Sequence, residues 1–507
     1  MLRSNGSPPR RAASRMSFRG QAAATLLAAS LALAGCSFVP AYQRPAPASP
    51  AAWNDAAQAS LAGTVAVASG WWRAYGDTAL DALVERGLQH NYSLASALAS
   101  VDEARANAEK AGAPLYPSLS LNGTFNRSHR RGGSSGSSGS GSASRSQSLF
   151  AEASYEIDFW GRNAANADAA GMLAQAAGFD RDTVALTLTA SIVDTYFQVQ
   201  SLRQRVALAQ SISANAARIL ALLQAQQAAG VATELQVQQQ RNALASFDAT
   251  IPALRQQLGQ NLHLLATLVG AVPEGFDVAA VPLAGIAVPQ PRPNLPASLL
   301  DTRPDIRASE ARLQAANYDV GAARAAFFPN LVLTTDGGLS SSALSHFLSS
   351  PFASVAAALT APIFDGGALR GQLHATEAAS AKSVADYRQT IVTALQDVED
   401  MLSAASQQQQ VETADQAAAD AAGKAAQLAE AQYRSGTVDF LTVLDTQRTR
   451  YQSDDALVQT RLARLQASVG LFRAFGGGFG VTERAPAVAS ATVPAALPDT
   501  SSHTLAP

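Results

Sequence analysis

Two sets of residues in this sequence have types that could support catalysis or bind a metal. The first, Gly132 to Gly136, matches the G-x-S-x-G pattern in which a hydrolase presents a nucleophilic serine. It lies in a run of Gly and Ser, without the strand and helix that must flank such a serine. The second is the six histidines, at positions 90, 129, 263, 346, 374 and 503, which show neither metal-ligand spacing nor a nearby acid pair. The sequence therefore predicts a protein that is not an enzyme and has neither a metal site nor a bound cofactor.

The only cysteine, Cys36, lies in a context that indicates covalent modification. Four arginines precede an apolar run from Ala22 to Ala34, which ends two residues before Cys36. This arrangement is typical of a secretory signal, and small residues directly before a cysteine resemble a bacterial lipobox. We therefore expect cleavage after residue 35, a lipid on Cys36 and, because Ser37 follows in place of Asp, sorting to the outer membrane. The alternatives are an ordinary signal with an incidental cysteine, and a translation start at Met16.

The composition excludes some partners. The chain has 37 Lys and Arg against 39 Asp and Glu, a net charge of -2, with 15% charged and 47% hydrophobic residues. Nucleic-acid binding needs clustered cations, which this balance does not provide. After the signal, no stretch is expected to be apolar enough for a membrane-spanning helix, so any membrane-spanning element must be a strand.

The elements that must position any functional residue occur twice. Two glycines recur at a spacing of 206 residues, from Gly161 to Gly367 and from Gly230 to Gly436. Each copy begins with two strands of alternating apolar and polar residues, followed by long helical segments that the second glycine interrupts. The chain is therefore a tandem duplication.

The predicted strands cover about 117–128 and 148–160 in the first copy and about 329–340 and 352–364 in the second. Segments of about ten alternating residues are typical of membrane strands, although a soluble sheet with one wet face alternates in the same way. The helices, about 163–270 and 368–474, would form rods of roughly 100 Å for each ~65-residue stretch. Pro252 should kink or divide one of them. Four strands cannot close a membrane barrel, so the chain must assemble with copies of itself.

Several motifs together carry a resemblance to a known family. The sequence resembles the outer membrane efflux proteins, the TolC-like channels, and within them the lipidated OprM/NodT-type branch. The matching segments cover nearly the whole mature chain and occur in the family's order: Cys36 with Val39 to Pro45, Trp71 to Arg73, Tyr155 to Arg162, Leu295-Pro296, Arg303 to Arg307, Phe327 to Pro329, Pro362 to Gly367, and Tyr433 to Gly436 with Leu444 to Arg448.

The resemblance implies a mixed α/β membrane protein, a homotrimer in which each chain gives four β-strands to one 12-stranded barrel and long α-helices to a periplasmic coiled-coil tunnel. It would be the lipid-anchored outer membrane exit duct of a tripartite RND-type efflux pump, passively conducting drugs or other toxic small molecules. Its partners would be a periplasmic adaptor and an inner-membrane RND transporter. The alternative is a lipid-anchored periplasmic adaptor or scaffold with coiled-coil hairpins.

On this interpretation the chain divides into six parts. They are the signal peptide 1–35, a lipidated periplasmic segment 36–75, the first repeat 76–272, a linker 273–294, the second repeat 295–476 and a flexible tail 477–507. The motif from Arg303 to Asp305 is interpreted as a helix start, since Pro favours the first helical position and Asp the first turn. The aromatic residues Trp71, Trp72 and Tyr75 are expected to pack in the core.

Three residues after the Gly436 break share a helical face. Leu441, Asp445 and Arg448 lie at i, i+4 and i+7. The resemblance implies that this face forms the periplasmic gate, with Tyr433 nearby; three copies would give an apolar ring and an anionic ring. The alternative is a surface ion pair between Asp445 and Arg448. Where relatives often have an Asp in the first repeat, this chain has Gln236, so the resemblance does not carry a gate contact by Asp over to that position.

Overall fold

The structure is a computed structural model that describes residues 38–45, 50, 52–53, 67–129, 143–292, 295–342 and 344–478. The signal segment and the predicted lipidation site Cys36 lie outside these residues. The chain forms two compact units, and each contains parts of both sequence repeats. The strand unit consists of Met1–Pro47, Ser96–Arg181 and Arg307–Ile391, and the helical unit of Ala48–Ala95, Asp182–Ile306 and Val392–Pro507.

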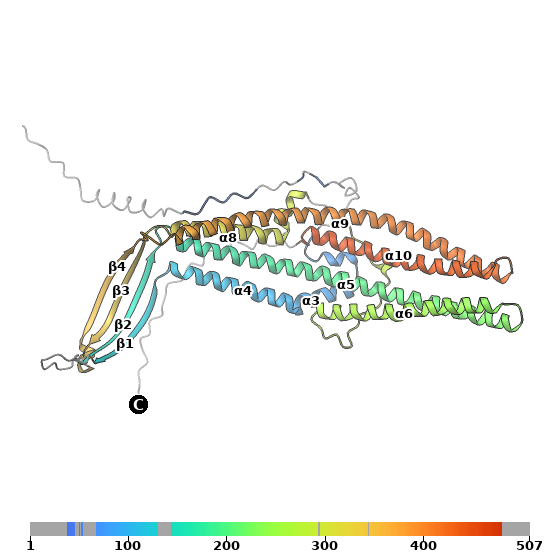
Figure 1. Ribbon diagram of the computed structural model, residues 1–507, viewed down its shortest axis with the longest axis horizontal. Coiled ribbons are helices and arrows are strands. Elements are labelled where there is room, and N and C mark those ends of the chain that lie inside the picture. The colour runs from blue at the N-terminus through green and yellow to red at the C-terminus, as the bar shows by residue number, and fades with distance from the viewer. Residues whose placement is uncertain are drawn as a thin grey trace, which may run out of the picture. The chain divides into compact units, whose positions relative to one another are not determined.

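The two repeats have the same order of α-helices and strands, although their short 3-10 helices lie at different places (Figure 1). The first contains two 3-10 helices, four α-helices and two strands, in the order η1 (Trp71–Tyr75), α3 (Thr78–His90), α4 (Tyr92–Gly112), η2 (Ala113–Leu115), β1 (Ser118–His129), β2 (Ala143–Ile157), α5 (Arg162–Ala228) and α6 (Glu234–Leu268). After η3 (Leu283–Gly285), the second contains η4 (Pro296–Ser298), α7 (Leu299–Thr302), α8 (Pro304–Ala325), β3 (Asn330–Ser341), η5 (Leu344–Ser349), β4 (Pro351–Thr360), α9 (Ala368–Arg434) and α10 (Phe440–Ala474).

The long helices end at the predicted glycines. Gly230 and Gly436 have φ angles of 74° and 76°, a left-handed conformation that terminates α5 and α9. The helices α5 and α9 are 67 residues each, and α6 and α10 are 35 each. Pro252 lies inside α6, which continues past it, so of the two expected outcomes, a kink or a division of the helix, the division is wrong. By length and composition α5 is also apolar enough to cross a membrane, contrary to the sequence-based expectation. Its apolar residues, such as Ile192, Val193 and Phe197, instead form part of the core of the helical unit.

The four strands form one antiparallel sheet in the order β1-β2-β3-β4, so β1 and β4 are its edges (Figure 1). Side chains alternate between two faces. One face is apolar, with large side chains that are 69% to 83% exposed: Leu119, Leu121, Phe125, Val355 and Leu359. The other face is polar. One row of paired neighbours across its four strands consists of Ser120, Glu152, Asp336 and Ser354.

Three predicted strand bounds need correction. The second strand begins at Ala143 rather than near 148, because the Ser-rich residues before 148 pair with the outer end of β1. It ends at Ile157, because Asp158 accepts hydrogen bonds from the backbone N–H groups of Arg162 and Ala164 and so caps α5. The fourth strand ends at Thr360 rather than 364, before Pro362, which has no N–H for a ladder.

Some segments predicted as linker or tail are packed. In the helical unit, Leu283 and Ile286 of the 273–294 segment are 1% and 2% exposed, and their carbonyls accept hydrogen bonds from Arg461. Gly477 and Gly478 are buried, so any flexible tail starts no earlier than residue 479, outside the described residues. Trp71, Trp72 and Tyr75 are buried in the core of this unit, which confirms the packing interpretation.

Candidate functional site: the helix tips

The two helix-to-helix turns of the helical unit pack against each other. The α5–α6 turn and the α9–α10 turn contribute to one apolar cluster, which contains Leu223 and Val237 from the first repeat and Phe440 and Val443 from the second. Phe440 is 1% exposed. We call the two turns the first tip and the second tip. This cluster fixes the backbone from which the predicted gate residues project.

The predicted gate face is present and lies outside that cluster. Leu441 is 55% exposed, and Asp445 and Arg448 are exposed on the same face of α10. Asp445 and Arg448 form no ion pair with each other within the described protomer, so the alternative of a surface pair is not supported. An exposed leucine with acidic and basic neighbours on one face can contribute to rings when copies are related by a rotation axis.

Tyr433 lies apart from these three residues. It is partly buried in the tip cluster, where its ring lies 5.7 Å from that of Phe440. Its hydroxyl donates a 3.4 Å hydrogen bond to the side-chain oxygen of Gln226 on α5. Burial raises the pKa of the Tyr433 phenol. Tyr433 therefore links the two tips within one chain rather than sharing the exposed face.

The tips differ in how their second helices begin. In the first tip, Gln236 accepts a 2.8 Å hydrogen bond from the backbone N–H of Thr233, whose hydroxyl accepts one from Gln236 N–H at 3.3 Å. This reciprocal capping box gives Gln236 a structural role at the start of α6. In the second tip, Asp439 caps α10 by accepting hydrogen bonds from the hydroxyl and the N–H of Thr442. Both hydrogen bonds lower the pKa of Asp439, and the one from the Thr442 hydroxyl lowers it more.

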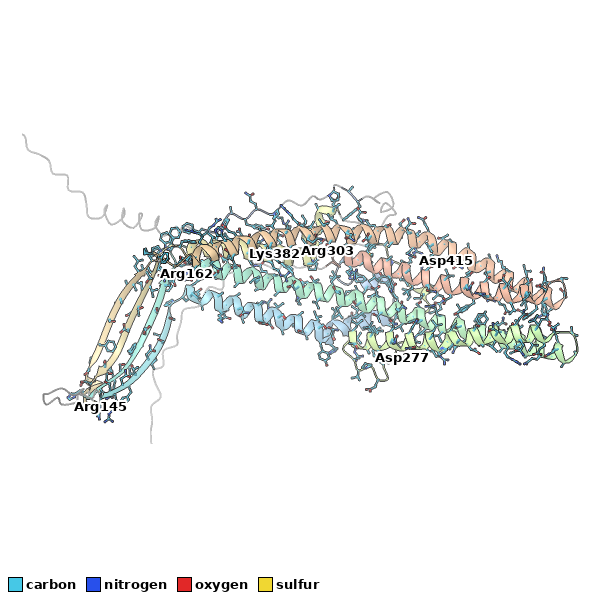
Figure 2. The ribbon with its side chains drawn as sticks, in the orientation of Figure 1. Arg145, Arg162, Asp277, Arg303, Lys382 and Asp415 are labelled. Carbon is cyan, nitrogen blue, oxygen red and sulfur yellow. The ribbon has the colours of Figure 1, made fainter. Side chains whose placement is uncertain are left out.

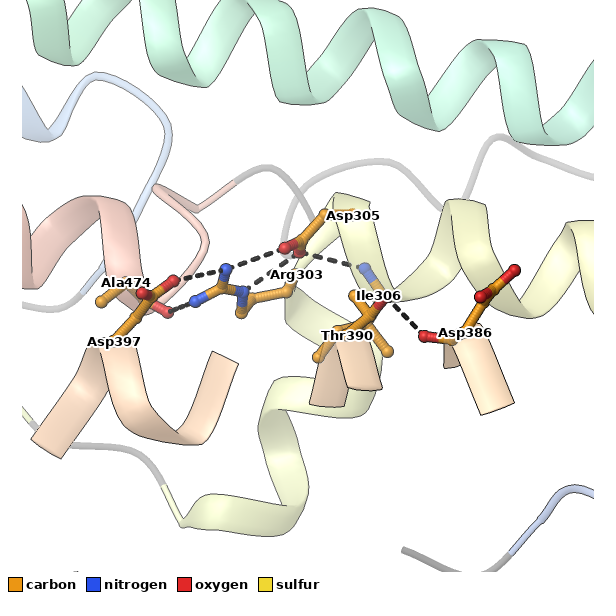
Figure 3. Close-up of polar contacts among 7 residues, drawn as sticks. All are labelled: Arg303, Asp305, Ile306, Asp386, Thr390, Asp397 and Ala474. Carbon is orange, nitrogen blue, oxygen red and sulfur yellow. Dashed lines mark hydrogen bonds and ion pairs between the residues drawn. The ribbon is translucent and has the colours of Figure 1, made fainter. Parts of the chain in front are cut away.

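A polar cluster at the far end of α10 was not predicted from the sequence (Figure 3). Arg303, 9% exposed, binds both carboxylate oxygens of Asp305, Oδ2 of Asp397 on α9 at 3.1 Å, and the carbonyl of Ala474 at the end of α10. We call these four groups the Arg303 cluster. Pro304 begins α8, as predicted, but only the fold brings Asp397 and Ala474 to Arg303. No sequence signal points to these contacts, since their partners lie 94 and 171 residues away.

The chain matches the family model described as "Outer membrane efflux protein" over residues 83–271 and 295–477. It is also 38% identical to the pyoverdine export outer membrane protein OpmQ of Pseudomonas aeruginosa, over 90% of this chain and 96% of that protein. The chain belongs to the outer membrane efflux protein family. Outer membrane protein OprJ of Pseudomonas aeruginosa is 34% identical, over 89% of this chain and 94% of that protein.

Solved structures of outer membrane channels share this fold. The outer membrane channel OprN matches with a TM-score of 0.80 and 28% identity, over 88% of this chain and all of that one. The open state of the Neisseria gonorrhoeae MtrE channel matches with a TM-score of 0.79 and 26% identity, over 87% of this chain and 98% of that one. Like these members, this chain is an outer membrane efflux channel of a Gram-negative bacterium that extends into the periplasm, and it is not an enzyme. The alternative of a lipid-anchored periplasmic adaptor is thereby excluded.

Proposed function

We propose that three copies of this chain close one 12-stranded barrel and serve as the exit duct of a tripartite RND-type efflux pump. The unpaired edges of β1 and β4 carry this proposal. An open sheet edge in lipid leaves backbone N–H and C=O groups without partners, at a cost of several kcal/mol each. Because β1 and β4 run antiparallel to each other along the meander, β4 of one copy can pair with β1 of the next around a ring.

The closure can be tested by crosslinking across the edges. Val355→Cys on β4 would be combined in turn with Leu119→Cys, Leu121→Cys and Gly123→Cys on β1. One register should give a covalent trimer on a denaturing gel after boiling. Cysteines on the inner strands, at Ala151 and Thr335, are the matched control, because their partners lie within one chain. A protein that remains a single subunit in outer membrane fractions would contradict the trimer.

The partners of this duct would be a periplasmic adaptor and an inner-membrane RND transporter. The names of its relatives describe several cargoes: OpmQ is a pyoverdine export protein, and TtgC of Pseudomonas putida is a toluene efflux pump protein. Relatives with one fold and different cargoes support a passive duct whose selectivity resides largely in the pump. Deleting the gene should sensitise the cell to an exported toxicant if no second duct substitutes. Complementation should require the matching adaptor and transporter, and rescue in their absence would contradict this assignment.

We infer that Leu441, Asp445 and Arg448 line the periplasmic gate. Their exposure on one face of α10 supports this role, and Tyr433 positions that face by holding the two tips together. Three Leu441 side chains would resist wetting, and three Asp445 carboxylates would attract cations.

Single-channel recording tests the gate. Replacing Asp445 and Arg448 by Ala should raise the conductance, because three aspartates and three arginines would leave the narrowest point of the trimer. The matched control is Arg450→Ala with Asp454→Ala, which removes an ion pair of the same helix outside the predicted face. An unchanged conductance in the first variant would count against the gate assignment.

We also propose that Cys36 is lipidated. Two residues after it, the Phe38 ring stacks on Phe328 at 4.5 Å, and Phe328 stacks on Trp160 at 4.8 Å. Phe328 and Trp160 flank the ends of β3 and β2 that adjoin helices, the level at which aromatic residues mark a membrane interface. Mass spectrometry of the mature N-terminal peptide should show a diacylated or triacylated cysteine. An unmodified cysteine, or cleavage elsewhere, would overturn the proposal.

A further inference from the structure

Two arginines face each other near one end of the sheet. Arg127 on β1 and Arg145 on β2 are direct cross-strand partners, and both side chains are exposed. Like charges at directly opposed positions destabilise an antiparallel pair. Neither arginine forms an ion pair with an acidic side chain in the part of the chain that the structure describes. Their arrangement therefore leaves a doubly positive site that an external anion would stabilise.

The pair lies on the apolar face of the sheet. Because side chains alternate along a strand, Arg127 shares a face with Leu119, Leu121 and Phe125. Arg145 likewise shares a face with Leu149, and Leu149 is paired with Gly123 of β1. This is the face whose large side chains are exposed, and so the face that contacts lipid in an outer membrane channel.

The pair also lies just beyond the apolar band. Arg145 lies near the end of the sheet at the β1–β2 hairpin, whereas Arg162 lies at the end from which α5 departs (Figure 2). Since the helices extend into the periplasm, the hairpin end faces the cell exterior. From Ile157 to Arg145 a strand tilted by ~40° rises roughly 30 Å, while an apolar band is ~25 Å tall. The arginines are therefore at the level of the outer leaflet's headgroups.

The chemistry of two adjacent guanidinium groups selects phosphate. A guanidinium group donates two parallel hydrogen bonds to phosphate oxygens, and two such groups can hold one phosphate from both sides. The outer leaflet of this membrane is built from a glycolipid with phosphates on its sugars. Phe125, 69% exposed in the preceding row of β1, offers an apolar contact for that lipid's acyl chains. We propose that Arg127 and Arg145 bind a sugar phosphate of the outer-leaflet glycolipid.

Native mass spectrometry of the purified full-length channel in a non-ionic detergent tests this site. The probes are diphosphoryl lipid A, the same lipid without phosphates, phosphatidylglycerol and inorganic phosphate. Wild-type protein should retain diphosphoryl lipid A in preference to the other three. Arg127→Gln with Arg145→Gln should weaken that retention by roughly tenfold or more, the loss expected for two charge-assisted partners.

Two further variants keep the result interpretable. Arg255→Gln, an exposed arginine on α6, removes one positive charge outside the sheet and should leave lipid A binding unchanged. Arg127→Lys with Arg145→Lys keeps the charge without the planar fork and should bind more weakly than wild type but more tightly than the Gln pair. Equal binding by the Gln pair, or equal retention of phosphate-free lipid or phosphatidylglycerol, would overturn the proposal. The measurement does not depend on transport, so its failure leaves the proposed duct untouched.

Discussion

The two repeats end their last long helices with the same backbone but different side-chain chemistry. Gly270, after α6, has a φ of 69°, and a Cβ added there would lie 2.3 Å from the carbonyl oxygen of His90. Gly476, after α10, has a φ of 87°, and a Cβ added there would lie 2.4 Å from the carbonyl oxygen of Thr302. Asn91 donates a 2.9 Å hydrogen bond to the carbonyl of Leu268, at the position where Arg303 donates to Ala474. The first repeat thus uses a neutral amide where the second uses a charged network. Duplication preserved the backbone geometry, while the charges diverged.

The tips show the same divergence. The first helical residue after the cap is the exposed Glu234 in the first repeat and the buried Phe440 in the second. The caps themselves are the neutral Thr233 and the ionised Asp439. The second tip therefore depends more on apolar burial and on charge. Since both tips belong to one molecule, each serves as the internal control for the other.

The largest difference should follow from Phe440→Ala. Removing this buried ring should lower the free energy of opening the second tip by roughly 3 kcal/mol or more, because a cavity replaces an aromatic side chain. Hydrogen exchange of the amides of α10 near the tip, in the intact channel, measures that free energy. The equivalent change, Glu234→Ala, should leave exchange in α6 as it is. Equal loosening of both tips by both variants would contradict the comparison.

A somewhat smaller effect is expected from Arg303→Ala. This change leaves the carboxylates of Asp305 and Asp397 without their arginine partner. We expect the free energy of opening the end of α10 to fall by about 3 kcal/mol. This is the low end for breaking a buried ion pair, because the Asp397 side chain is 43% exposed. Asn91→Ala should cost about 1 kcal/mol, the value of an ordinary hydrogen bond. Hydrogen exchange in the last turn of α10 measures the effect of Arg303→Ala, and exchange in the last turn of α6 measures that of Asn91→Ala. If Asn91→Ala proved the more damaging, the charged network would not be the stronger restraint.

Asp194 should make the free energy of unfolding depend on pH near neutrality, and Asp400 lies at the equivalent position of the second repeat. Burial raises the pKa of Asp194 to about 7, partly offset by the charge of Arg473, and its Oδ1 has no hydrogen-bond partner in the described structure. A folded pKa above the unfolded value of ~3.9 means that stability declines as the pH rises from 4 to 7. Asp194→Asn should therefore raise the free energy of unfolding at pH 8 by roughly 2 kcal/mol, after allowing for partial solvation, and leave it unchanged at pH 4. A higher melting temperature at pH 8 alone would show this.

The control for that experiment is Asp400→Asn. Asp400 is exposed and bonded to Gln396, so its replacement should shift the melting temperature at neither pH. A shift of the same size for both variants would show that burial at Asp194 is not the cause.

The smallest effect concerns the two caps. The pKa of Asp439 is lowered, so its contribution is present above the unfolded pKa and is lost as the pH falls through the folded value. Acidification from pH 6 to 3 should therefore speed exchange in the second tip relative to the first, after correction for intrinsic rates. Asp439→Asn should abolish that pH dependence while keeping the cap, and Thr233→Asp should introduce it into the first tip. A pH response in the unaltered first tip would argue against this cause.

Several features could be predicted from local sequence patterns. The glycines at 161, 230, 367 and 436 marked the repeat and the helix breaks, because a left-handed turn favours a residue without a Cβ. The alternation of side chains gave the four strands, because its period of two reports one wet and one apolar face. The predicted ends of the strands were less accurate, because alternation does not report capping or strand pairing. Asp158 caps α5 and so ends β2, and the Ser-rich start of β2 is a strand because it pairs with β1.

The candidate site was predicted in part. The shared face of Leu441, Asp445 and Arg448 follows from helical spacing alone, whereas Tyr433 required the fold to show that it packs between the tips. The role of Gln236 in a capping box has a local signature, Thr-x-x-Gln, and could have been predicted.

By itself the sequence determined the duplication, the element types and the outer membrane family. Each of these follows from periodicity, from local conformational preference or from motifs along the chain. Only the tertiary structure decided that each compact unit combines both repeats, that Arg303 joins three helices, and that Arg127 and Arg145 face each other. Those facts depend on strand register and on contacts between residues far apart in the sequence, and neither is encoded in any single local segment.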